Sequence, residues 1–169
     1  MNLKNELVTQ NRYEFFSKIV PISVFVLMLF GGYVKAIGAG LACPDWPFCH
    51  QQLIPIYYGD EPFIWVLMEY VHRLIALGVT FLIITMTYQS FNFKNELRHN
   101  NPVGMRRFLL SLLITALLFI QISLGGLTIF TYLDELVVTT HLAIATLIFG
   151  LSIVHYTWVS KNYIPVKLD

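Results

Sequence analysis

The sequence predicts an all-α integral membrane four-helix bundle, built as two helical hairpins that form a pseudo-twofold repeat. Apolar residues make up 56% of the 169 residues and charged residues only 12%, and the mean hydropathy is +0.64. Four segments are long enough to cross a membrane, which takes about 20 apolar residues at ~1.5 Å of rise each. We therefore expect a single transmembrane domain over residues 1–169.

The predicted spans are residues 19–37, 63–88, 108–130 and 136–159, and the longest connection, residues 38–61, carries both cysteines. Loops rich in Lys and Arg stay in the cytoplasm. Basic residues precede the first span, separate the second from the third, and follow the fourth: Lys4, Arg12, Lys18, Lys94, Arg98, Arg106, Arg107, Lys161 and Lys167. We expect cytoplasmic N- and C-termini and an outward cysteine loop in a prokaryotic plasma membrane. Because topology explains these charges and the net charge is +1, no nucleic acid is expected as a partner.

The first and third spans end near matching glycine pairs, Gly31-Gly32 and Gly125-Gly126, and a span with a histidine follows each. A twofold axis along the membrane normal would place His72 and His141 at similar depth on opposite sides of a shared cavity. Histidine is the usual axial ligand of b-type haem, so the pair predicts a haem-iron site. The glycines let a flat macrocycle approach the backbone, although close helix packing explains them equally well.

The second span contains a cluster of ionisable residues, which are costly in lipid and are therefore functional candidates. Glu69 and His72 are three residues apart and share one helix face, so Glu69 could move protons beside a metal. The alternative is that Glu69 only pairs with Arg73. We also expect Arg73 to neutralise haem propionates.

The remaining histidines and Lys35 are expected to have other roles. His155 lies on nearly the same face as His141, but the inner half of the second span has no partner histidine, so we expect an interfacial side chain. Lys35 is expected to extend to the membrane surface, and His50 and His99 to lie in loops.

Cys43 and Cys49 lie in the outward loop, where an oxidising environment favours a disulfide that braces the loop. Their spacing differs from the CxxC of thiol oxidoreductases, and two cysteines are too few for a four-ligand zinc site. A reversible redox role stays open.

Three stretches carry a resemblance to a known family. Residues 38–49 closely resemble the outward-loop signature of the haem A synthase family, and residues 69–73 are similar to its Glu-x-x-His-Arg element. The third match is residues 121–128, with His141 following, so all four spans are covered. The resemblance implies a membrane oxidoreductase that catalyses the last step of haem A biosynthesis, oxidising the C8 methyl of haem O through a hydroxymethyl stage to a formyl group.

The resemblance also implies site residues and partners. It makes Glu69 the catalytic carboxylate, His72 and His141 ligands of haem iron, and Cys43 with Cys49 the loop pair. Usual family members have eight spans in two halves, with separate sites for substrate haem O and cofactor haem b, whereas this chain resembles one half. We therefore expect a homodimer, with contact through the small-residue faces at the two glycine pairs, and haem O synthase and an electron donor as further partners.

Two functions of other classes remain open. A bis-histidine b-type cytochrome, or a haem-binding module, would hold haem without modifying it. A quinone-linked thiol oxidase would depend on Cys43 and Cys49 and be indifferent to loss of His72.

Overall fold

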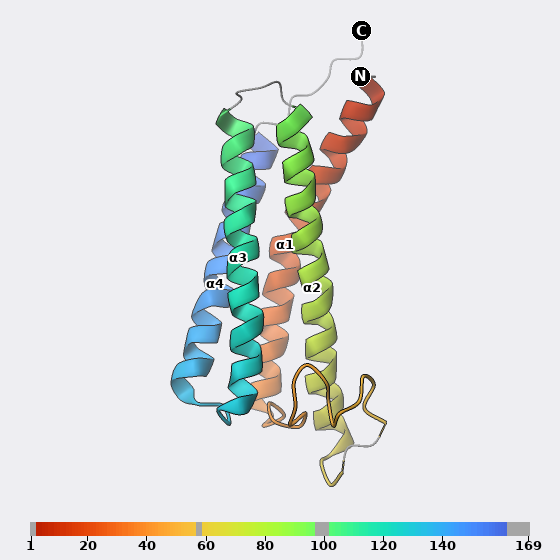
Figure 1. Ribbon diagram of the computed structural model, residues 1–169, viewed down its shortest axis with the longest axis vertical. Coiled ribbons are helices and arrows are strands. Elements are labelled where there is room, and N and C mark those ends of the chain that lie inside the picture. Colours follow the sequence, from red (N-terminus) through yellow and green to blue (C-terminus); the bar gives the residue numbers. More distant parts are fainter. Residues whose placement is uncertain (1–2, 57–58, 97–101, 162–169) are drawn as a thin grey trace.

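The computed structural model describes residues 3–56, 59–96 and 102–161, and Arg98, His99 and Lys167 lie outside them. The described residues form four long helices, α1 (Leu3–Ala36), α2 (Phe63–Glu96), α3 (Pro102–Phe130) and α4 (Glu135–Lys161). All four are long and apolar enough to span a membrane. The predicted all-α membrane bundle is thus confirmed (Figure 1).

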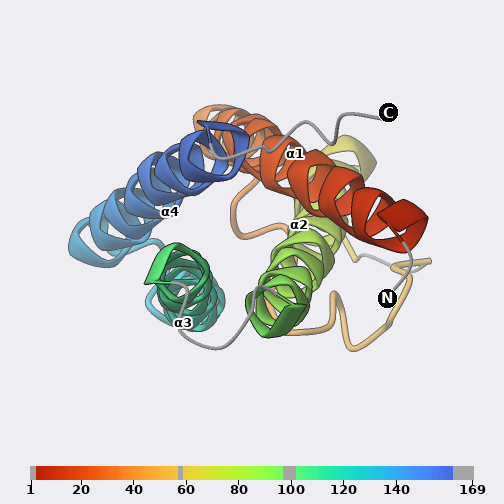
Figure 2. The same cartoon turned by 90° about the horizontal axis from the view of Figure 1, so that it is seen from above.

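The helices are arranged as a square when the bundle is seen along its axis (Figure 2). Helix α1 packs against α2 and α4, and α3 packs against the same two helices. Helices α2 and α4 are therefore diagonal partners, as are α1 and α3. A side chain that points inward from α2 faces one that points inward from α4.

The end of the bundle that carries the cysteine loop is called the outer end, after the predicted orientation, and the opposite end the inner end. The spans predicted from hydropathy match the outer helix ends but stop short of the inner ends. At the outer end the predicted limits 37, 63, 130 and 136 lie within one residue of the helix limits 36, 63, 130 and 135. At the inner end α1 begins at Leu3 and α2 continues to Glu96. Hydropathy detects only the part of a helix in hydrocarbon, whereas the 34 residues of α1 reach about 51 Å.

The two hairpins are equivalent in how their first helices end. After α1, Gly38 has a φ of 80°, and Ala39 N–H donates to the Val34 carbonyl over 3.0 Å. After α3, Tyr132 has a φ of 52°, and Leu133 N–H donates to the Thr128 carbonyl over 2.8 Å. Both are Schellman ends with a left-handed residue at the same repeat position. In the second half Asp134 then caps α4, because its carboxylate accepts from Leu136 and Val137 N–H.

The larger core cluster of the bundle uses buried aliphatic side chains from all four helices, among them Val20, Val24, Val79, Ile83, Ile114 and Ile148. Many large apolar side chains elsewhere on the helices are exposed. In a membrane these face lipid rather than water, which removes the usual cost of exposing them.

A layer of buried polar side chains joins the inner ends of the helices. The hydroxyl of Tyr13 on α1 contacts Nε2 of His155 on α4 and Oγ of Ser90 on α2, each at 3.1 Å. His155 is 0% exposed. The expectation of an interfacial His155 is therefore wrong: its imidazole is a core group, and the Tyr13 hydroxyl satisfies part of its hydrogen-bonding capacity.

Candidate functional site

The predicted histidine pair lies near the outer ends of the two diagonal helices. His72 is on α2 and His141 is on α4. Both residues are partly buried. Nδ1 of each ring is fully buried and has no hydrogen-bond partner.

Each histidine ring rests against a glycine of the neighbouring helix. A Cβ atom built on Gly31 would lie 2.8 Å from Cε1 of His72, and one built on Gly125 would lie 3.3 Å from Cε1 of His141. The two halves thus repeat the same contact, glycine of the first helix against histidine of the second. These glycines make room for the rings, because any side chain there would occupy the space of the imidazole.

The glycines do not form the outer small-residue faces that were expected to support a homodimer. Gly31 and Gly125 are turned inward to the histidines, and Gly126 faces Trp46, whose ring would lie 3.1 Å from an added Cβ. Only Gly32 of the four has open space where a Cβ would be. Three of the four glycines thus make contacts within the bundle itself.

The matched glycines allow a controlled test of the histidine seat. We expect Gly31→Ala to lower the haem affinity of the purified protein, because the new methyl must displace the ring of His72. Overpacking of this kind costs about 1–3 kcal/mol, or roughly five- to 150-fold in affinity. Gly32→Ala is the control, since its methyl meets no atom within 4 Å. Equal haem affinity in both variants, measured by Soret absorbance in a haemin titration, would remove His72 from the site.

The carboxylate of Glu69 is held at the boundary between α2 and the cysteine loop. The residue is 5% exposed. Its Oε2 accepts from the backbone N–H of Cys43 over 2.7 Å, and its Oε1 pairs with Arg73 over 2.5 Å. The ion pair named as the alternative therefore exists, and it fixes the carboxylate one helical turn outward from His72.

Arg73 connects α2 to the cysteine loop. Its guanidinium donates to the carbonyls of Cys43 over 3.0 Å and Asp45 over 2.8 Å, and also to that of Phe48. Together with Glu69, these acceptors engage both terminal nitrogens of the side chain. A role of Arg73 toward haem propionates stays a prediction, whereas its contacts show that it fastens the loop.

The loop is closed by the predicted disulfide and lies over the outer end of the bundle. Cys43 and Cys49 are bonded, with Cα atoms 4.6 Å apart, and both pack with Val66 of α2. Within the loop, both carboxylate oxygens of Asp45 accept backbone N–H groups, from His50 and Gln51. These two residues have positive φ, so Asp45 holds a backbone conformation that L-residues rarely adopt.

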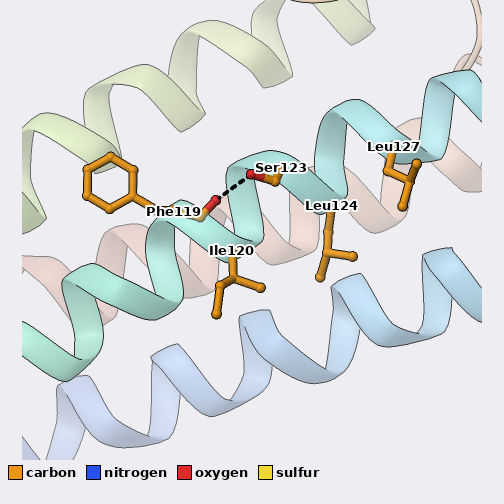
Figure 3. A pocket seen from close by; sticks show the side chains of 5 residues that line it. All are labelled: Phe119, Ile120, Ser123, Leu124 and Leu127. Carbon is orange, nitrogen blue, oxygen red and sulfur yellow. Dashed lines mark hydrogen bonds between the residues drawn. The ribbon is translucent and has the colours of Figure 1, made fainter.

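Other predicted residues lie away from this constellation. Lys35 is exposed at the outer end of α1, in agreement with the expected surface position. His50 lies in the loop, where its Nε2 contacts the carbonyl of Ala42 over 2.9 Å. A shallow cavity of about 510 Å³ lies elsewhere on α3, lined by Phe119, Ile120, Ser123, Leu124 and Leu127 (Figure 3).

Sequence reasoning assigned no role to Gln121, which contacts the site. Its amide Nε2 lies 3.1 Å from Nε2 of His141. The sequence does contain a signal for Gln121. A side-chain amide is unusual inside an apolar span, and Gln121 lies one helical turn before Gly125.

The donor set fits a haem better than a bare metal ion. Among the described residues, no group of three or more His, Cys, Asp or Glu side chains could hold a metal ion. A porphyrin brings its own equatorial nitrogens and needs only axial ligands. Two imidazoles on diagonal helices can supply such ligands.

Comparisons with known proteins agree with the motifs. Residues 15–167 match the family described as cytochrome oxidase assembly protein, COX15-CtaA. The chain is 27% identical over 132 residues to a protein named heme A synthase from Lysinibacillus sphaericus, covering 78% of this chain and 40% of that protein. It is 29% identical over 146 residues to a protein of the same name from Geobacillus thermodenitrificans, covering 86% and 41%. The chain thus spans about two fifths of the length of these relatives. No solved structure matches it at a significant level.

Proposed function

The chain belongs to the haem A synthase family, and on that premise we propose that it oxidises the C8 methyl group of haem O to a formyl group. The observation that carries the proposal is the repeated glycine–histidine seat on the diagonal helices. His72 and His141 would hold a haem through their imidazoles, and the bound haem would supply the redox chemistry at its iron.

In this proposal Glu69 is the group that accepts and delivers protons. Its carboxylate is nearly buried and shares α2 with His72. The N–H of Cys43 and the guanidinium of Arg73 fix both carboxylate oxygens, so the group is oriented without a rearrangement. A carboxylate placed in this way could accept the hydroxyl proton of a hydroxymethyl group as that group is oxidised to a formyl group, with the electrons passing to an external acceptor.

The disulfide loop would position this carboxylate. Arg73 ties three loop carbonyls to α2, and Trp46 of the loop rests on Gly126 of α3. The loop thereby covers the outer end of the bundle, where it would limit the access of water to the reacting group.

We further propose that two such four-helix units act together. One unit offers one histidine pair, whereas separate sites for substrate haem O and cofactor haem b require two. A second copy of the chain, paired in a homodimer, would supply the other. Copies with two different tags should then copurify from one membrane, and purification of each tag alone would contradict the pairing.

The proposed placement is a bacterial plasma membrane with both termini in the cytoplasm. The inner end of the bundle carries exposed Arg12, Lys18 and Arg106, together with Lys161. The loop of residues 38–56, which contains the Cys43–Cys49 disulfide, lies at the opposite end (Figure 1). The positive-inside rule and the need for an oxidising environment around a disulfide support the same orientation.

The reaction is tested by identifying the haems that the protein holds and makes. We expect cells that supply haem O and express the chain to yield haem A on extraction and chromatography, and cells without the chain to yield haem O alone. Bound haem without any formyl product would instead favour a bis-histidine cytochrome. Activity lost in Cys43→Ser but kept in His72→Ala would favour a thiol oxidase.

A further inference from the structure

The two histidine seats differ at one repeat-related position. Gln121 lies four residues before Gly125, and Leu27 lies four residues before Gly31. His72 is stacked on Phe30, with ring centroids 6.4 Å apart and an interplanar angle of 12°. His141 instead meets the Gln121 amide. The seats of His72 and His141 are therefore alike in their glycine contacts and different in their polar contacts.

The amide of Gln121 occupies the Nε2 side of the His141 ring. As oriented, its Nε2 donates over 3.1 Å, so His141 Nε2 accepts and the ring proton resides on Nδ1. That Nδ1 and the amide Oε1 are both buried without a hydrogen-bond partner. If the amide were turned over, its oxygen would take the same place against Nε2, so either orientation blocks this nitrogen.

A ligand atom cannot keep a hydrogen bond along the direction in which it binds a metal. If His141 binds iron through Nε2, the contact with Gln121 must break first. No hydrogen-bonding side chain stands at the corresponding position beside His72, because Leu27 is apolar.

We propose that Gln121 is a positioning residue that competes with haem iron for Nε2 of His141. Of the two residues that would hold the haem, His141 would then release it more readily and His72 would hold it longer. This inference rests on the proposed haem site and deepens it. A haem that enters as substrate and leaves as product needs one ligand that releases readily, and a nearby amide that takes over the freed nitrogen lowers the cost of release.

The test compares the wild type with Gln121→Leu and Leu27→Gln, which exchange the two repeat-related side chains. Haem affinity is measured by titrating haemin into haem-free protein and following Soret absorbance. A net hydrogen bond of about 0.5–1.5 kcal/mol corresponds to roughly two- to tenfold in affinity. We expect Gln121→Leu to bind haemin more tightly by that factor and Leu27→Gln to bind it more weakly.

The second measurement is carbon monoxide binding to the reduced protein, which reports how readily an axial ligand is displaced. We expect Gln121→Leu to bind carbon monoxide several-fold more slowly than the wild type. A residue that only supports the His141 ring would give the reverse, with weaker haem binding and faster carbon monoxide binding after its removal. That result, or no change in either measurement, overturns the inference.

These measurements separate this inference from the proposed reaction. Both measurements use bound haemin and need no haem A formation. A protein that binds haem without oxidising it therefore still shows whether Gln121 competes for His141. A wild type that shows no Soret band on titration overturns the haem site and this inference together.

Discussion

Replacing Glu69 by Gln is expected to abolish haem A formation while leaving the amount of bound haem nearly unchanged. The amide keeps the size of the carboxylate but cannot take up a proton. General acid–base catalysis contributes about 10²- to 10⁴-fold, so product per bound haem should fall by at least about 100-fold. Haem A and haem O are separated by chromatography of the extracted haems, and total haem is read from Soret absorbance.

Two further variants make the Glu69 result interpretable. Glu61→Gln removes an exposed carboxylate in the loop, two residues before α2 begins at Phe63, and should leave product formation unchanged. Arg73→Gln breaks the same ion pair as Glu69→Gln but keeps the carboxylate. If Glu69 serves only to pair with Arg73, the two variants should behave alike. Unchanged haem A in Glu69→Gln would remove this residue from the mechanism.

The second large expected effect is the loss of bound haem when both histidines are replaced. The double variant His72→Ala, His141→Ala is expected to lose bound haem, so that Soret absorbance per protein falls at least about tenfold. Axial imidazoles are the only protein ligands in this proposal. In the single variants one imidazole remains, and haem should be retained with an altered spectrum and bind carbon monoxide readily when reduced.

The control for the double variant is His50→Gln. His50 lies in the cysteine loop and contacts a backbone carbonyl, and glutamine keeps a donor there, so haem content should stay unchanged. A Soret band that persists undiminished in the double variant would exclude the pair as the haem ligands. Such a result would also contradict the proposal that Gln121 competes with iron for Nε2 of His141, because His141 would then not bind iron.

Much of the fold follows from sequence because crossing a lipid bilayer is a strong constraint on each segment by itself. Every backbone polar group in hydrocarbon must be satisfied within its helix, so four apolar segments mean four helices. Turn-forming residues set the outer helix ends, as at Gly38. The repeat was also visible, since the glycine pairs and the following histidines stand at matching positions.

The candidate site was predictable where chemistry alone singles out a residue. His72, His141 and Glu69 are ionisable groups in apolar spans. The free-energy cost of placing such groups in lipid marks them as functional candidates, whatever direction their side chains take. Sequence could not tell what each group contacts. The expected role of Arg73 toward haem propionates stays a prediction, and its contacts with carbonyls of a loop 25 to 30 residues away could not be foreseen from sequence.

The sequence by itself determined the four spans, the internal repeat, the disulfide loop and the polar residues that can carry chemistry. Only the tertiary structure decided that Gly31 seats His72, that Gln121 occupies Nε2 of His141, and that His155 is buried against Tyr13. The physical reason is that membrane insertion depends on each segment's own transfer free energy. Polar pairing instead depends on the rotation of packed helices, which joins residues as far apart as 142 positions in the chain.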